Sequence, residues 1–79
     1  MERKARRTSQ ADPRVTFGRH IAELRRRAGL SQEALAFESG LARSYLGGVE
    51  RGQRNISLIN ICRLAEALQV RPSRLFEPL

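Results

Sequence analysis

The sequence predicts an all-α fold of five short helices. Apolar residues recur at the three- and four-residue spacing of one helix face, first at Phe17, Ile21, Leu24 and Ala28. Glycine and serine separate successive apolar stretches, as they do where helices end and begin. No segment alternates apolar and polar residues in the manner of a half-buried strand. The length of 79 residues suits one domain.

The first two helices are delimited by Gly29, Ser31 and Gly40. The first is predicted to begin at Thr16 and to end at Gly29, which acts as a C-terminal cap. The second is predicted over residues 32–39, because the hydroxyl of Ser31 suits the N-cap position. Gly40 is expected to end it with a positive φ, which glycine adopts at the lowest cost.

Three further helices are predicted in the second half of the chain. The third covers residues 42–51 and ends at Gly52, and the fourth begins after Ser57, its N-cap. A short fifth helix begins at Pro72, since proline is favoured in a first helical turn. The inward face of the fourth helix is predicted to contain five apolar residues: Leu58, Ile61, Leu64, Ala65 and Leu68.

The N-terminal segment differs from the rest of the chain. Residues 1–15 carry five cations, among them Arg3, Lys4, Arg6 and Arg7, and have no apolar period. They are predicted to form a flexible basic arm, so the helical domain comprises residues 16–79. The arm is expected either to insert into or wrap a groove of DNA, or to remain a disordered end without contacts.

The charge balance indicates a polyanionic partner. Fifteen Lys and Arg residues stand against eight Asp and Glu residues, which gives a formal net charge of +7. Fourteen of the fifteen cations are arginine, whose planar guanidinium matches phosphates and guanine edges. A GC-rich genome would also favour arginine, but it would not account for the net charge. Nucleic acid is the simplest partner with this chemistry.

Enzymatic, metal-binding and membrane functions find no support in the sequence. A domain this small buries only about 60% of its unfolded surface, which leaves little room for an active-site cleft. The lone Cys62 is expected to be a small buried hydrophobe, and His20 a solvated residue without a second metal ligand. We therefore expect no metal, cofactor or catalytic residue. Without a signal peptide or apolar span, the protein is expected to be cytoplasmic.

Residues 32–51 form the pattern of a helix-turn-helix, two short helices joined by a tight glycine turn. Ala36 is predicted to lie where the helices cross, because a larger side chain would push them apart. Gly40 occupies the turn. Four apolar residues are predicted to hold the crossing angle: Leu35, Leu41, Leu46 and Val49. An ordinary helix pair would not need all of these features together.

The segment from about Phe17 to Phe76 resembles the Cro/CI-like, or Xre-type, family of bacterial and phage repressors. The run GLARSYLGGVERGQRNISLINI is similar, more narrowly, to the controller proteins of restriction–modification systems. This resemblance implies a compact five-helix, λ-repressor-like domain that binds operator DNA as a symmetric dimer. It leaves the basic arm out.

The resemblance also implies which residues contact DNA. Gln32, at the start of the second helix, is expected to touch the DNA backbone or a nearby base. Arg43 and Ser44 are expected to lie against base edges in the major groove, with Tyr45 and Gly48 on the same surface. Four residues further on are expected to follow the phosphates: Arg51, Arg54, Asn55 and Ser57.

Gly47 and Gly48 are unexpected in a helix, where each glycine costs about 1 kcal/mol relative to alanine. Helical spacing places them in the outward rows that contain Arg43, Ser44 and Arg51. We interpret them as bare backbone that lets the helix approach the duplex and leaves Arg43 free to reach a guanine, a contact worth about 1–3 kcal/mol. The alternative is that the helix frays and bends at Gly47.

Two neighbouring residues are interpreted as structural. A carboxylate facing DNA would be repelled, so Glu50 is expected to turn back to pair with an arginine, and the resemblance indicates Arg25 as its partner. A role of Glu50 in excluding wrong bases is the alternative. Phe37, where the similar controller proteins also carry an aromatic residue, is expected to serve packing.

One recognition helix reads only a few base pairs, so two copies are expected to read a palindrome with half-sites about one helical turn apart. The predicted dimer surface is the C-terminal part, because an exposed apolar patch usually marks an interface. It is predicted to contain four apolar residues: Ile59, Leu75, Phe76 and Leu79.

The sequence therefore predicts a homodimeric, sequence-specific transcriptional regulator that binds duplex DNA. The resemblance to controller proteins implies autoregulation, in which the dimer blocks or recruits RNA polymerase. A phage-type repressor, or the antitoxin of a toxin–antitoxin pair, is the alternative within this class. A protein- or RNA-binding adaptor with the same fold is the alternative from a different class.

Overall fold

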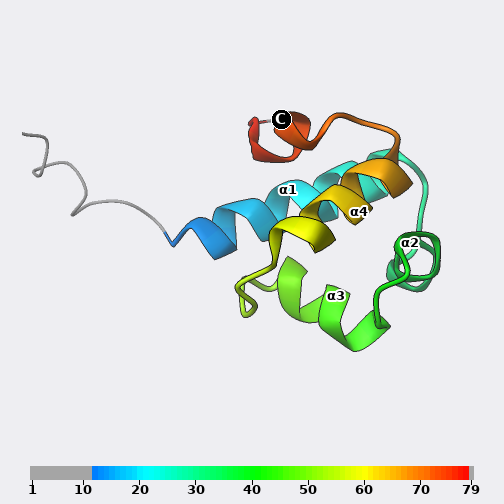
Figure 1. The fold of residues 1–79 in the computed structure, drawn as a ribbon, viewed down its shortest axis with the longest axis horizontal. Helices are drawn as coiled ribbons and strands as arrows, with labels where there is room; N and C mark the ends of the chain where they lie inside the picture. Colours follow the sequence, from blue (N-terminus) through cyan, green and yellow to red (C-terminus); the bar gives the residue numbers. More distant parts are fainter. Residues whose placement is uncertain (1–11, 79) are drawn as a thin grey trace, which may run out of the picture.

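The computed structural model describes residues 12–78, which contain four α-helices, one 3₁₀-helix and no strand (Figure 1). The α-helices are α1 (Pro13–Arg27), α2 (Gln32–Ser39), α3 (Arg43–Glu50) and α4 (Leu58–Leu68), and η2 (Pro72–Phe76) is the 3₁₀-helix. The all-α prediction is confirmed. The fifth element is a 3₁₀-helix because so short a segment rarely completes an α-helical ladder. No helix in this range is long and apolar enough to cross a bilayer.

Helix α1 begins at Pro13, three residues before the predicted start. Asp12 is extended, and its carboxylate accepts a hydrogen bond from the backbone N–H of Arg14 at 2.9 Å. Pro13 then occupies the first turn, where its missing N–H leaves no hydrogen bond unmade. Residues 13–15 of the predicted arm are therefore helical, and residues 1–11 lie outside the described range.

The turn between α2 and α3 has the predicted glycine geometry. Gly40 has a φ of 74°, in the left-handed region that favours glycine. The N–H of Leu41 donates to the carbonyl oxygen of Ala36 at 3.0 Å and closes the end of α2. Ala36 itself is 3% exposed and belongs to the apolar core. These contacts form the predicted helix-turn-helix.

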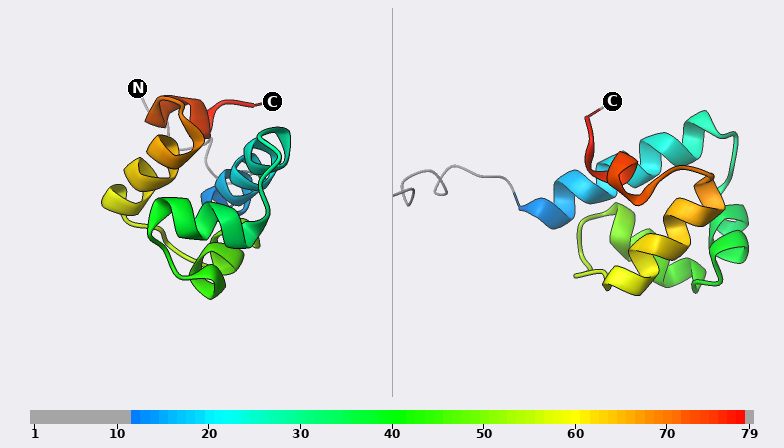
Figure 2. Two further views of the ribbon diagram at one scale, coloured as in Figure 1. Left: turned by 90° about the vertical axis from the view of Figure 1, so that its right-hand side faces the viewer. Right: turned by 45° about the horizontal axis from the view of Figure 1, so that its top comes forward.

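An apolar core joins all the helices. Helix α3 packs against α1 and α2, whereas α4 packs against α2, and η2 contacts both α1 and α4. Figures 1 and 2 show η2 and α3 on opposite sides of the layer that α1 and α4 form. The buried members of the core are Phe17, Ile21, Leu35, Ala36, Leu46, Val49, Leu64, Ala65 and Leu75.

Gly18 sets the closest approach between α1 and α3. A Cβ atom at this position would overlap the carbonyl oxygen of Val49 and would lie 2.8 Å from that of Glu50. Backbone atoms cannot move aside as a flexible side chain can, so only glycine fits here. No local pattern in the sequence marks Gly18, because the segment that restricts it is distant in the chain.

His20, Leu58 and Cys62 lie elsewhere than predicted. His20 is half-buried rather than solvated, and its Nδ1 lies 3.0 Å from the carbonyl oxygen of Leu75, which links α1 to η2. Leu58 is 74% exposed, because it begins α4 beyond the edge of the core. Cys62 is exposed rather than buried, since α4 turns Leu64 and Ala65 inward and this residue away from them.

Candidate nucleic-acid interface

The start of α3 presents exposed donors. Arg43 and Ser44 are both exposed in the first turn of this helix. Their N-cap residue is Ala42, which has no side-chain oxygen to bond the free N–H groups of the turn. Within residues 12–78, Arg43 makes no side-chain hydrogen bond or ion pair, so its guanidinium remains available. Free N–H groups and a cation at a helix N-terminus suit an anionic partner.

A shielded ion pair joins the end of α3 to α1. Glu50 accepts hydrogen bonds from Arg25, Nε to Oε2 at 2.7 Å and Nη2 to Oε1 at 3.1 Å. The two side chains are only 13% and 6% exposed. Arg25 also donates to the carbonyl oxygen of Leu30 at 2.9 Å, in the turn that leads to α2. The structure thus contains the pair that the family resemblance implied, with Glu50 turned toward α1.

This pair has consequences for charge and for Gln32. The hydrogen bond with Glu50 raises the pKa of Arg25 above its ordinary value, although burial opposes the shift. The guanidinium therefore stays charged. Gln32 donates its amide Nε2 to Glu50 Oε1 at 2.8 Å, so the ion pair holds the first residue of α2 against α3. The amide oxygen of Gln32 makes no hydrogen bond among the described residues.

Gly47 and Gly48 are buried, so the expectation of bare backbone is wrong. A Cβ on Gly47 would lie 3.2 Å from Nη1 of Arg51 and 3.7 Å from Oε1 of Gln32. A Cβ on Gly48 would lie 3.0 Å from Cγ of Arg54. Helix α3 continues through both glycines, so it does not fray there. The glycines make room for side chains that were themselves predicted to contact DNA.

Arg54 and Tyr45 form a stacked pair. The guanidinium carbon of Arg54 lies 5.4 Å from the centroid of the Tyr45 ring, within the range of a cation–π interaction. The Tyr45 hydroxyl accepts a hydrogen bond from Nδ2 of Asn60 at 3.3 Å. Its own proton remains available to an acceptor outside the protein.

The other predicted phosphate contacts lie in or beside the loop after α3. Arg51 is exposed, and its Nε donates to Oε1 of Gln53 at 3.1 Å. Asn55 is exposed. The hydroxyl of Ser57 accepts a hydrogen bond from the N–H of Asn60 at 3.1 Å and caps α4 as predicted. Because Gly47 and Gly48 have no side chains, Gln32 of α2 and the loop residues Arg51 and Arg54 can lie close to α3.

Phe37 does not pack as expected, because its side chain is 85% exposed. Helix α2 buries the side that contains Leu35, Ala36 and Ser39, and Phe37 projects away from that side. Position 37 was interpreted from an aromatic residue in similar proteins, and such a likeness does not distinguish a buried ring from an exposed one.

The predicted dimer residues divide into two groups. Ile59 is 66% and Phe76 57% exposed, and the Phe76 ring packs on Phe17 with centroids 5.1 Å apart. Leu75 is fully buried in the core, so its assignment to the dimer surface is wrong. The 3₁₀-helix turns Leu75 inward and its neighbour Phe76 outward. Leu79 lies outside the described residues.

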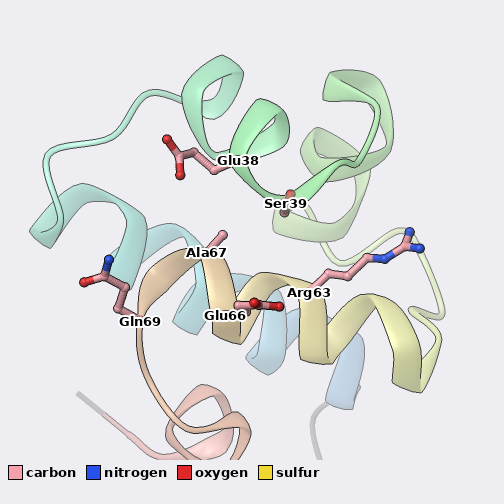
Figure 3. A pocket seen from close by; sticks show the side chains of 6 residues that line it. All are labelled: Glu38, Ser39, Arg63, Glu66, Ala67 and Gln69. Carbon is pink, nitrogen blue, oxygen red and sulfur yellow. The ribbon is translucent and has the colours of Figure 1, made fainter.

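A shallow polar hollow of about 320 Å³ lies between α2 and α4 (Figure 3). Glu38 and Ser39 line it from α2, and Arg63 and Glu66 from α4. It contains none of the residues predicted to bind DNA. The mixed charges of its walls do not complement a polyanion.

The fold and this surface define a helix-turn-helix protein. Residues 21–75 match the family model described as Helix-turn-helix, HTH_3, and the chain belongs to this family. Its function is accordingly that of a DNA-binding transcriptional regulator and not that of an enzyme, as predicted.

Similar proteins narrow the class. Control protein C.BamHI of Bacillus amyloliquefaciens is 43% identical over 65 residues, which cover 81% of this chain and 80% of that protein. The restriction–modification controller protein C.AhdI of Aeromonas hydrophila is 63% identical in sequence. Its crystal structure matches with a TM-score of 0.79 over 80% of this chain and 96% of that one. SinR, a master regulator for biofilm formation, was crystallised in complex with DNA and is 31% identical, with a TM-score of 0.73 over 77% of this chain and 98% of that one.

Proposed function

We propose that the protein is the controller of a restriction–modification system and acts as a homodimer on a palindromic operator. The observation that carries this proposal is the surface described above, on which exposed Arg43 and Ser44 at the start of α3 adjoin Gln32, Tyr45 and Arg54. The 63% identity to a restriction–modification controller protein supports the narrower class. Such a regulator acts on the DNA inside the cell, so we expect it in the cytoplasm.

In this proposal Arg43 and Ser44 read base edges from the N-terminal end of α3, as recognition helices do. Gln32, Tyr45 and Arg54 belong to the same contact surface, and Gly48 lies beneath Arg54. Arg51, Asn55 and Ser57 follow the phosphates, where cationic and polar contacts set the register without specifying sequence.

The dimer is supported by the apolar residues left exposed in the single chain. Ile59 and Phe76 lose contact with water only if a partner covers them. A shallow hollow of about 180 Å³ beside Phe76 is lined by Phe17, Ile56 and Ile61 and also by polar residues, among them Arg54 and Asn55. Large apolar side chains left exposed in this way are typical of an interface. A twofold dimer would present two α3 helices to two half-sites.

The regulatory mechanism follows from occupancy. A dimer bound at the operator of its own promoter either blocks RNA polymerase or contacts and recruits it, depending on the position of the site. Because dimerisation depends on concentration, occupancy rises steeply as the protein accumulates. Autoregulation of this kind fits the controller class.

Selection of bound sites from random duplex DNA tests the proposal. We expect an inverted repeat with half-site centres about one helical turn, or a multiple of it, apart. The affinity should fall with salt at a log–log slope of about −0.9 for each phosphate neutralised. If the recovered sequences share no motif and the affinity depends steeply on salt, sequence-specific regulation would be contradicted. A protein or RNA partner would then be the alternative.

A further inference from the structure

The side chain of Arg54 lies on a helix to which it does not belong. Helix α3 ends at Glu50, yet the aliphatic part of Arg54 returns to cover Gly48. A Cβ on Gly48 would lie 3.0 Å from Cγ, 3.2 Å from Nε and 3.6 Å from Cδ of Arg54. The first two distances are tighter than side chains normally accept, so the missing side chain at position 48 creates the space that Arg54 fills.

Two further contacts hold Arg54 in this position. The N–H of Gln53, its neighbour, donates to the carbonyl oxygen of Gly48 at 2.8 Å and holds the loop backbone on the helix. The Tyr45 ring, one helical turn before Gly48, lies 5.4 Å from the guanidinium carbon. Asn60 of α4 donates to the Tyr45 hydroxyl at 3.3 Å. Backbone, ring and glycine together form a seat for one arginine.

We propose that Gly48 is a positioning residue, whose lack of a side chain seats Arg54 against Tyr45 and so presets the guanidinium for DNA. This inference rests on the proposed function. An exposed arginine otherwise loses much rotamer freedom when it binds, and a preset one has already lost it. Glycine at position 48 lowers the stability of the helix relative to alanine, but it allows the Arg54 position that favours DNA binding.

In the opposite relation, the position of Arg54 over Gly48 would hinder DNA binding. Arg54 in its seat would then cover the surface of α3 and would have to leave before DNA bound. The two relations differ in sign. A preset Arg54 predicts weaker operator binding when the seat is filled, whereas a covering Arg54 predicts tighter binding.

The first measurement uses the free protein and needs no DNA. In the wild type we expect nuclear Overhauser contacts from the Arg54 side chain to the Gly48 α-protons and to the Tyr45 ring. Gly48→Ala, and more completely Gly48→Val, should remove the contacts to Tyr45. Gly47→Ala is the matched control, since its Cβ would meet the flexible tip of Arg51 instead. Persistence of the Arg54–Tyr45 contacts in Gly48→Val would overturn the seat.

The second measurement is a double-mutant cycle on the selected operator. Arg54→Ala should weaken binding about tenfold, the loss expected for one charge-assisted hydrogen bond. Gly48→Val should weaken wild-type binding by a similar factor but have no effect in the Arg54→Ala background. The inference would be overturned if the two substitutions lowered the affinity independently, so that their factors multiplied in the double variant. Tighter binding by Gly48→Val would also overturn it. If the wild type selects no operator, the proposed function fails, together with the DNA-binding part of this inference, while the first measurement still decides the seat.

Discussion

Two regions of the molecule differ in how completely their side chains are buried within a single chain. One is the junction between α1 and α3, and the other is the face formed by α4 and η2. At the junction, Gly18 lies against the backbone of α3, and Arg25 and Glu50 pair with little exposure. On the other face, Ile59 and Phe76 are 66% and 57% exposed. No buried side-chain polar atom in the described residues lacks a hydrogen-bond partner.

The junction is packed within one chain, whereas the exposed apolar residues of the other face support the proposed dimer. The junction fixes the position of α3 against α1, as the proposed reading of DNA by this helix requires. The apolar face contributes little to the stability of one chain, so we attribute its exposed residues to association. Substitutions at the junction should therefore unfold the protein, and substitutions on the apolar face should separate its copies.

Gly18→Ala should have the largest effect. The added Cβ would overlap the Val49 carbonyl oxygen, and α1 would have to move away from α3. We expect a loss of about 3 kcal/mol in the free energy of unfolding, the upper end for overpacking. Urea denaturation measures this loss. Gly47→Ala, which adds a Cβ on the same bundle near a flexible arginine tip, is the control and should be neutral or stabilising.

Glu50→Ala should have the next largest effect. It removes the partner of a shielded guanidinium and the acceptor for Gln32. Arg25 keeps its bond to the Leu30 carbonyl and some access to water, so we expect a loss of about 2 kcal/mol, below the range for a fully buried pair. Glu66→Ala, at an exposed position on α4, is the control for urea denaturation. Equal stability of the two variants would mean that the ion pair is dispensable.

Ile59→Asp should change association rather than folding. The side chain is largely exposed in one chain, so the secondary structure should persist, which circular dichroism can verify. Sedimentation equilibrium should show a monomer, and operator affinity should fall at least tenfold, because one half-site then binds alone. Leu75→Asp cannot serve this test, since it would place a carboxylate in the core. A tight dimer of Ile59→Asp would move the interface elsewhere.

Asp12→Ala should have the smallest effect and a pH dependence. Hydrogen bonds from the Arg14 side chain and backbone lower the pKa of Asp12 below its ordinary value of 3.8. A lowered pKa in the folded state means that ionised Asp12 favours folding above pH 3.8 and that this contribution disappears as the pH falls through the lowered value. The melting temperatures of wild type and variant should differ slightly at pH 7 and converge in acid. A constant difference would exclude an ionised cap.

Local chemistry predicted most of the helix boundaries. Ser31, Gly40 and Ser57 act through groups one to four residues away, so their caps and turns are visible in the sequence. The predicted start of α1 is three residues late, because Asp12 is the N-cap of this helix and Pro13 its first residue. That signal was present in the sequence.

Contacts between distant segments were less predictable. Backbone atoms of α3 leave room only for glycine at position 18, and His20 contacts a carbonyl oxygen of η2. Neither residue has a recognisable local pattern. Leu75 and Phe76 are both apolar, and only the packing of η2 shows which one enters the core. For the candidate site, the resemblance indicated the residues but not their relation: Arg54 covers Gly48, and the glycine backbone is not bare.

The stacked pair of Arg54 and Tyr45 has a practical consequence for spectroscopy. The chain contains one tyrosine and no tryptophan, so its intrinsic ultraviolet emission arises essentially from Tyr45. The protein therefore carries its own optical reporter beside the guanidinium and within the surface proposed to meet DNA. Quenching or recovery of that emission would follow both the arginine and the duplex in solution, without a dye and without altering a single residue.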